Sequence, residues 1–370
     1  MDGFRFVLPT FVSKRTLGAK LFFCVICGWI FLMNPIVGIG EVLWDVYPDG
    51  RKVAGGAPFN FAFHCHQLGH PSVIVSRVGD DDLGRELRER IRELGLSDEY
   101  IQTDRDHPTG TVQVTLDANA VPTYTITENV AWDHIEWDER LADLASRYEA
   151  ACFGTLAWRG MKDLIDWNVL VRFFTTPSRV FERVNLFDPL APPPRSARAH
   201  KQEPRPLRVA DLNLRPPFVN DNVVGLALGG PNWFKLNFDE MRMMWPKLVP
   251  IPGREEFSPR NWYERLYGVS QAGESQAMDF MMIATDGPSG VTVVHRDYEF
   301  HEPGVPAKVV DTVGAGDAFT AAMVCLHLEG KSLRECARFA VHYAARVCEQ
   351  PGGTPRIDRA EVEQAAGLST

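Results

Sequence analysis

The 370-residue sequence lacks three features that would assign it to a special class. It has no excess of basic residues: 39 Lys and Arg stand against 48 Asp and Glu, so a nucleic-acid partner is not expected. Its seven cysteines are odd in number and scattered, which disfavours a disulfide framework and favours a reducing, cytoplasmic setting. Its apolar stretch at residues 21–33 is too short to span a bilayer comfortably, so no membrane partner is expected.

Residues 1–33 are set apart as an N-terminal extension. Basic residues precede the apolar stretch, as in a signal peptide, but no small-x-small cleavage site follows it. Instead, Asn34-Pro35 leads directly into "IVGIGEVLWD" (36–45), which is typical of a buried strand. Met33 stands at this boundary, so a start assigned upstream of the true Met33 explains the segment at least as well as export does.

From Ile36 onward, segments typical of strands and helices alternate. Helices are predicted at 57–69, 81–95, 315–329 and 332–349, and strands at 36–45, 71–79, 150–156, 278–287 and 290–296. This alternation predicts an α/β fold, with a mostly parallel sheet and helices on both faces. The main domain is expected over 34–358, with 359–370 as a C-terminal tail. The Pro-rich segment 189–207 has no period and is expected to be a surface loop or a disordered insertion.

The stretch "VVDTVGAGDAFT" (309–320) carries the clearest chemical signal. We expect a short strand at 308–312, a flexible turn, and then a helix. Gly314 and Gly316 let backbone N–H groups converge at the positive end of the helix dipole, which suits a phosphoryl group. Asp317 at the helix mouth has two equally good explanations: it caps the helix, or it is a base that takes a proton from a hydroxyl.

The rest of the chain bears on this choice. "DTVGAGDAF" resembles the C-terminal signature of the ribokinase (PfkB) family of sugar and nucleoside kinases, and "GGAPFNFAFHCHQLG" (55–69) resembles its N-terminal signature. "KLNFDE" (235–240) resembles the family's Asn-x-x-Glu segment, and "TDGPSG" (285–290) its nucleotide loop. The resemblance runs in family order from about Ile36 to about Pro355. The two paired signatures make it highly specific.

The resemblance implies a doubly wound α/β domain and a small β-sheet lid with strands near 46–54 and 109–127. It implies Asp317 as the catalytic base and an anion hole at Gly314, Ala315 and Gly316. Sugar hydroxyls would be contacted by Asp45, Gly55, Gly56 and Asn60. ATP would be bounded by Asn237, Thr285, Gly287 and Gly290.

Two cation sites follow from the same resemblance. Glu240 would face Mg²⁺ through water. Asp311 and the Val313 carbonyl match positions that in many members hold a monovalent cation, commonly K⁺. A structural explanation stays open for Asn237 and Glu240, which have the spacing of a helix cap and its capping-box partner. A homodimer through the lid is a further expectation.

The resemblance favours fructose as the substrate, phosphorylated to fructose 6-phosphate. Ala57-Pro58 follows Gly55-Gly56 where ribokinases usually carry Lys, and Gly40-Glu41 and "DLNLR" (211–215) look more like fructokinases. Three alternatives stay open: ribose, 2-keto-3-deoxygluconate, and a catalytically silent regulator that binds sugar or nucleotide. The acidic sugar becomes the better candidate if Arg159 or Arg215 points into the pocket.

Overall fold

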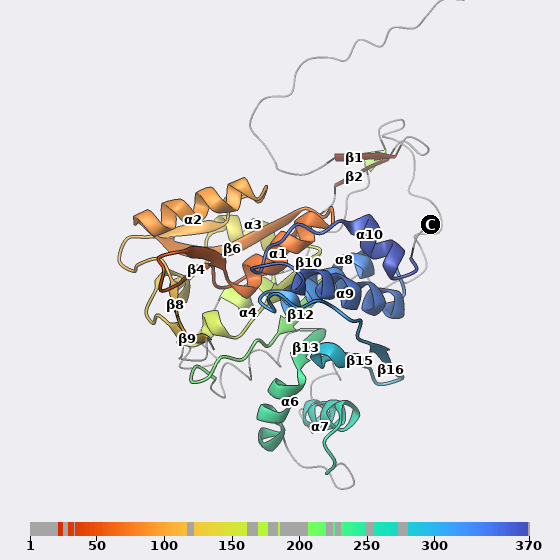
Figure 1. Cartoon of the computed structure of the whole chain (residues 1–370). Coiled ribbons are helices and arrows are strands. Elements are labelled where there is room, and N and C mark those ends of the chain that lie inside the picture. The colour runs from red at the N-terminus through yellow and green to blue at the C-terminus, as the bar shows by residue number, and fades with distance from the viewer. Residues whose placement is uncertain are drawn as a thin grey trace, which may run out of the picture.

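The computed structural model describes residues 21–24, 29–32, 34–116, 122–160, 169–176, 184–185, 206–219, 225, 231–248, 255–272 and 280–368. Its central feature is a nine-stranded sheet (Figure 1). The strand order is β16-β15-β14-β13-β12-β10-β3-β6-β7, parallel from β14 to β7 and antiparallel at β15 and β16. The strands are β3 (Ile36–Ile39), β6 (Ser72–Gly79), β7 (Ile101–Asp104), β10 (Ala150–Phe153), β12 (Leu207–Asp211), β13 (Trp233–Asn237), β14 (Met281–Thr285), β15 (Gly290–Val294) and β16 (Glu299–Pro303).

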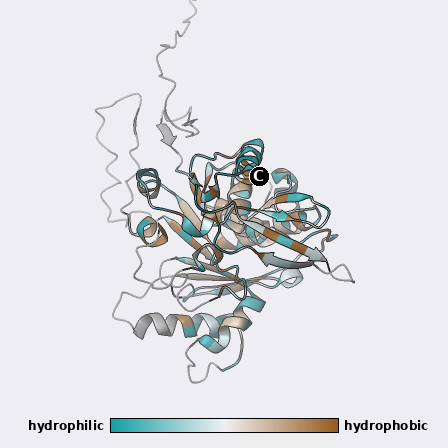
Figure 2. Cartoon of the chain, turned by 90° about the vertical axis from the view of Figure 1, so that its left-hand side faces the viewer, coloured by the Kyte–Doolittle hydropathy of each residue, from teal (hydrophilic) through white to brown (hydrophobic). Residues whose placement is uncertain are grey.

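Helices cover both faces of this sheet, as the alternation predicts. One face packs against α1 (Ala57–Gln67), α2 (Asp82–Glu93), α8 (Ala315–Leu328), α9 (Leu333–Cys348) and α10 (Arg359–Ala365). The other packs against α3 (Glu139–Ala145), α4 (Val169–Thr175), α6 (Phe238–Met244) and α7 (Pro259–Ala272). The strands have near-continuous apolar sequences because both faces are buried. Hydrophobic segments accordingly gather where helices meet the sheet (Figure 2).

Local sequence signals set several of these helix boundaries. Asp81 caps α2 by accepting the N–H of Gly84, and α2 ends just before Gly95, whose φ of 88° favours glycine. Ser332 and Glu335 form a capping box at the start of α9. These signals lie within a few residues of each boundary, which is why both helices could be predicted.

A separate four-stranded sheet has the order β5-β4-β8-β9. Its strands are β4 (Leu43–Val46), β5 (Lys52–Gly55), β8 (Thr111–Leu116) and β9 (Pro122–Ile126), close to the positions expected for a lid. The prediction of one strand over 36–45 is wrong, because the chain leaves the main sheet after Ile39 and enters the small sheet at Leu43. Gly40, with φ of 144°, makes this change of direction in a backbone region that favours glycine.

Three other segments differ from expectation. Residues 308–312 form no strand, and Val309 and Val310 are exposed. The loop is held instead by the N–H groups of Val310 and Asp311, which donate to the carbonyl of Cys348. The expected tail contains α10, whose Val362 is buried against the α8–α9 core. Of the Pro-rich segment, residues 189–205 lie outside the described residues, and Leu207 already begins β12.

The N-terminal extension contributes strands to a third, small sheet. β1 (Leu21–Cys24) pairs antiparallel with β2 (Trp29–Leu32), and β2 pairs with β11 (Val184–Asn185). This sheet shares no strand with the nine-stranded sheet. Within the described ranges, no helix is both long and apolar enough to cross a membrane.

Candidate active site

The site lies at the carboxyl ends of the central parallel strands. After β3 the chain first builds β6 and β7 on one side, and then β10, β12, β13 and β14 on the other. A doubly wound sheet binds ligands beside such a reversal, outside the carboxyl ends of its strands. Glu41, Asp211, Asn237 and Thr285 all lie at or just after these ends.

The glycine turn at the start of α8 is shaped by close packing. Gly314 is the N-cap and has φ of 76°. A Cβ there would lie 2.5 Å from Cα of Gly353, so only glycine fits. The N–H of Ala315 donates to the Thr312 carbonyl, whereas the N–H groups of Gly316 and Asp317 donate to no described residue. Of the residues expected to form the anion hole, Gly314 and Gly316 have N–H groups that donate to no described residue, and so does the neighbouring Asp317. The anion hole itself stays a prediction.

Asp317 does not cap its helix. It is the third residue of α8, and the N-cap position belongs to Gly314. Its carboxylate accepts a hydrogen bond of 2.8 Å from the amide Nδ2 of Asn60 on α1. Burial raises the pKa of Asp317 to about 7, with a further rise from Asp211, although Asn60 and nearby cations oppose the change. A carboxyl that titrates near neutral pH is suited to general-base chemistry.

Asn60 joins the two sequence signatures at one point. It lies in the first turn of α1, after the N-cap Gly56, and is buried. Its Oδ1 accepts no hydrogen bond from the described residues, although its Nδ2 holds Asp317. Gly353 packs against this amide, since a Cβ on Gly353 would come within 2.8 Å of it. A buried acceptor without a donor is costly, so Asn60 is suited to a hydroxyl-bearing ligand.

Asp45 reaches this region from the small sheet. It lies on β4, and a Cβ on Gly55 would come within 2.9 Å of its carboxylate. A Cβ on Gly56 would lie 2.4 Å from the Glu41 carbonyl, so the backbone leaves room only for glycine there. Burial raises the pKa of Asp45 to about 6, and the charge of Asp311 raises it further. That coupling places Asp45 within electrostatic reach of the loop before α8.

Asn237 and Thr285 are register partners at the carboxyl ends of β13 and β14. Asn237 caps α6 in a capping box with Glu240, so the structural explanation for this spacing holds. The two Glu240 oxygens accept N–H groups of Leu214 (2.7 Å) and Asn237 (2.8 Å). Burial raises the pKa of Glu240, while Lys235 lowers it. Each oxygen keeps a lone pair for water, so a role toward a metal stays a prediction.

Gly287 and Gly290 bracket a short turn after Thr285. Both have positive φ, 47° and 104°, and a Cβ on Gly290 would lie 2.2 Å from the Glu302 carbonyl. The N–H of Asp286 donates to the Gly290 carbonyl and closes the turn. The turn therefore starts beside Asn237, where a nucleotide loop was expected.

Asp311 ties two loops together. Its carboxylate accepts the N–H of Val313 (3.0 Å) and the N–H of Gly352 (2.9 Å). The part of the chain that the structure describes contains no group of three or more His, Cys, Asp or Glu residues able to hold a metal ion. The K⁺ site expected at Asp311 and Val313 stays a prediction.

The sequence comparisons agree with this geometry. Residues 45–155 and 196–359 match the pfkB family of carbohydrate kinases. The chain belongs to this family. A fructokinase from Klebsiella pneumoniae is 26% identical over 291 residues, which are 77% of this chain and 82% of that protein.

Solved structures place this PfkB chain in the ribokinase fold. A ribokinase from Arabidopsis thaliana, complexed with ribose and ATP, superposes with a TM-score of 0.67 at 20% identity. The superposition covers 91% of this chain and 100% of the ribokinase. A fructokinase from Xylella fastidiosa with bound ATP gives 0.66 at 18% identity, covering 90% and 99%. The predicted doubly wound sheet with a smaller second sheet is confirmed.

Sequence reasoning gave no role to Glu41, Asp211 and Lys235 of this PfkB chain. Glu41 is buried and accepts the N–H of Ala57, but its Oε2 accepts nothing from the described residues. Burial raises the pKa of Glu41 to about 7, although two backbone hydrogen bonds and the charges of Arg215 and Arg159 lower it. Asp211 and Lys235 form a buried ion pair. The signal that was available is a charged residue on each of two largely apolar strands, Asp211 at the end of "LRVAD" and Lys235 inside "WFKLN".

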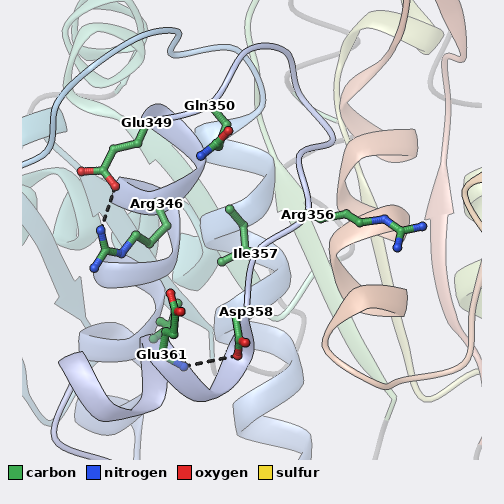
Figure 3. Close-up of a pocket in the computed structure, with 8 residues that line it drawn as sticks. Arg346, Glu349, Gln350, Arg356, Ile357, Asp358 and Glu361 are labelled. Atoms are coloured by element: carbon green, nitrogen blue, oxygen red, sulfur yellow. Dashed lines mark hydrogen bonds and ion pairs between the residues drawn. The ribbon is translucent and has the colours of Figure 1, made fainter.

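A pocket of about 200 Å³ lies elsewhere, where the end of α9 meets α10 (Figure 3). Arg346 pairs with Glu349, and Asp358 accepts the N–H of Glu361. Arg356 points away from the other lining side chains (Figure 3). None of the candidate site residues lines this pocket, and its cations do not converge, so its chemistry does not suit a nucleotide phosphate.

Proposed function

We propose that this PfkB chain transfers the γ-phosphoryl group of ATP to a sugar hydroxyl. The observation that carries the proposal is the 2.8 Å hydrogen bond from Asn60 to Asp317 at the mouth of α8, which joins the two family signatures. ATP use is further supported by the relatives of this fold that were solved with ATP.

Asp317 acts as the general base. Its carboxylate takes the proton of the sugar hydroxyl, the freed oxygen attacks the γ-phosphorus, and the bond from that phosphorus to the β-phosphate bridging oxygen breaks to release ADP. The N–H groups of Gly316 and Asp317 and the positive end of α8 lie where negative charge develops on the transferred group. Asn60 orients the base through its amide.

Mg²⁺ fits the oxygen donors beside α6. Glu240 is a buried carboxylate that its two backbone partners orient, and its remaining lone pairs suit a cation held through water. When bound with ATP, the ion would neutralise charge on the β- and γ-phosphates. Asn237, Thr285, Gly287 and Gly290 are proposed to bound the nucleotide. K⁺ at Asp311 and Val313 is a separate expectation, to be tested by itself.

Fructose, phosphorylated at its terminal hydroxyl, is the substrate that we propose first. Asp45, Asn60 and the Gly55-Gly56 backbone offer neutral and acidic polar groups for hydroxyls, and Ala57 leaves no cation at the start of α1. A site built for particular hydroxyls rejects sugars that lack them, because its polar groups are then left unpaired. The orphaned Asn60 Oδ1 is one such group.

An acidic sugar such as 2-keto-3-deoxygluconate is the second candidate. Arg159 forms a buried ion pair of 2.7 Å with Asp133, although its charge also lowers the pKa of Glu41. Arg215 is exposed, and its charge lowers the pKa of both Glu41 and Asp317. This shared influence places Arg215 within electrostatic reach of the site, where it would favour a carboxylate or a phosphate.

Initial rates of ADP release on fructose, ribose and 2-keto-3-deoxygluconate test the choice. We expect the highest kcat/KM on fructose. Arg215→Met separates the two candidates: it should leave the KM for fructose nearly unchanged, whereas a preference for the keto acid that this variant abolishes would replace the fructose assignment. A cytoplasmic location, with its supply of ATP, and a homodimer through the small sheet remain parts of the proposal.

A further inference from the structure

A buried charged cluster lies directly beneath the glycine turn of α8. The Lys235 ammonium donates to Oδ1 of Asp211 at 3.0 Å, and the Thr320 hydroxyl lies 2.9 Å from Oδ2 of the same carboxylate. All three residues are buried, with at most 6% of each residue exposed. Burying a charge costs folding free energy unless the charge is paired and hydrogen-bonded, so a buried charged cluster suggests a role other than stability.

Strand register brings the ion pair together. Asp211, the last residue of β12, and Lys235 on β13 are Cα partners in adjacent parallel strands. Thr320 reaches them from α8, one turn after Gly316. The Thr320 hydroxyl also lies 3.0 Å from the Gly316 carbonyl, so its single proton serves either the carboxylate or the turn. The cluster thus connects two strand ends to the first turn of α8.

The ammonium lies immediately under the turn that carries Asp317. A Cβ on Gly316 would come within 2.9 Å of the Lys235 Nζ, so this turn and the ammonium are in direct contact. Gly316 precedes Asp317, the proposed base. The reaction as proposed makes no use of Lys235 or Asp211.

We propose that Lys235 and Asp211 are positioning residues for the phosphoryl transfer: they hold the Gly314–Asp317 turn and set the charge around the Asp317 carboxylate. This inference rests on the proposed function, in which Asp317 is the base. The pair acts through Asp317 and does not touch the substrate.

The electrostatics of the region agree with this assignment. After burial, the charge of Asp211 is the strongest influence that raises the pKa of Asp317, and Lys235 lowers it. The pKa of Lys235 is itself raised despite burial, because Asp211, Glu240 and Asp317 all favour its charged form. The other groups around Asp317 are Asn60 and Arg215, which both lower its pKa. Cys152 on β10 lies nearby, and burial raises the pKa of its thiol, which keeps it neutral.

The test compares the pH dependence of kcat/KM in two variants. Asp211→Asn removes the carboxylate that raises the pKa of Asp317 and leaves the ammonium that lowers it. The acid limb of the profile, where kcat/KM rises with pH, should therefore move to lower pH by about half a unit or more. Adding Lys235→Met to that variant removes the ammonium too, so the limb should move back upward by a similar amount. The pair of variants isolates the effect of Lys235 without leaving Asp211 buried and unpaired.

Arg359→Met is the matched control. Arg359 forms an ion pair with Glu329 at the far end of α8, about 18 Å from Asp317 along the helix at 1.5 Å per residue. Its loss should lower thermal stability without moving the acid limb. Circular dichroism melts of all variants show that the measured rates come from folded protein.

Two outcomes separate the inferences. Equal acid limbs in the wild type, Asp211→Asn and the double variant would overturn the positioning role, even if each variant lost kcat. Near-normal kcat in Asp317→Asn, measured in parallel, would instead overturn the proposed base. If Asp211→Asn does not fold, the conservative variant Lys235→Arg is measured in its place. Lys235→Arg should keep the acid limb of the wild type, and a moved acid limb would count against the proposal.

Discussion

The pH dependence of kcat/KM offers a quantitative prediction for Asp317. Its pKa is raised from 3.8 to about 7, chiefly by burial. The ionised, base-competent fraction should therefore rise from about one tenth at pH 6 to about nine tenths at pH 8, a roughly tenfold gain in kcat/KM. An Asp with an ordinary pKa would give a flat profile over the same range.

The assay is initial-rate ADP release between pH 5.5 and 8.5 at subsaturating sugar. Asn60→Leu provides the control, because the Asn60 amide lowers the pKa of Asp317 and its loss should move the acid limb to higher pH. If the profile instead reported a titrating group of the substrate, the acid limb would be the same in Asn60→Leu and the wild type. A flat wild-type profile between pH 6 and 8, or identical acid limbs in both proteins, would show that Asp317 does not set the pH dependence.

Three further predictions concern the base, the N-terminus and the cation. Asp317→Asn should lower kcat by about two to four orders of magnitude. The raised pKa also means that the folded wild type loses stability as pH rises from 3.8 towards 7, because burying the ionised Asp317 is costly. Asp317→Asn should therefore melt at a higher temperature than the wild type at pH 8, and the difference should vanish below about pH 4. Equal melting temperatures at pH 8 would contradict the raised pKa. A chain that starts at Met33 should be soluble and fully active, because β1 and β2 share no strand with the central sheet; an inactive or unfolded product would make residues 1–32 part of the fold. Rates should be higher in K⁺ than in tetramethylammonium at equal ionic strength if Asp311 and Val313 hold a cation, and equal rates would remove that site.

Local patterns were enough to predict most of the fold. The strand at 72–79 and the helices at 82–93 and 333–348 follow from apolar periodicity and from caps that lie within three residues of each start. The parallel sheet follows from the alternation of these elements. The family fold and the small lid sheet were predicted from the resemblance, because periodicity alone does not show how the strands are connected.

The errors have non-local causes. The 36–45 stretch is mostly apolar and has the pattern of one strand, but the chain breaks at Gly40, and the Glu41 carbonyl packs closely against Gly56, 15 residues later. Residues 308–312 are rich in valine, yet the carbonyl of Cys348 takes their N–H groups instead of a neighbouring strand. A tertiary contact decided both cases against local propensity.

The site shows the same division. Asp317 and Asn60 could be singled out from their signatures, but only the fold shows that they bond to each other, 257 residues apart in sequence. The cap at the start of α8 is Gly314, which removes the capping explanation for Asp317. The pairing of Asp211 with Lys235 became visible only through strand register, because nothing in the local sequence pairs residues 24 positions apart.

ATP-dependent phosphate transfer by the wild-type chain and by Asp317→Asn should be measured on one panel of sugars, with the product identified by mass. We expect a sugar monophosphate and stoichiometric ADP from the wild type, fastest on fructose, and a rate at least about a hundredfold lower in the folded variant. No sugar-dependent ADP release by the wild type, or an equal rate in Asp317→Asn, would contradict this expectation.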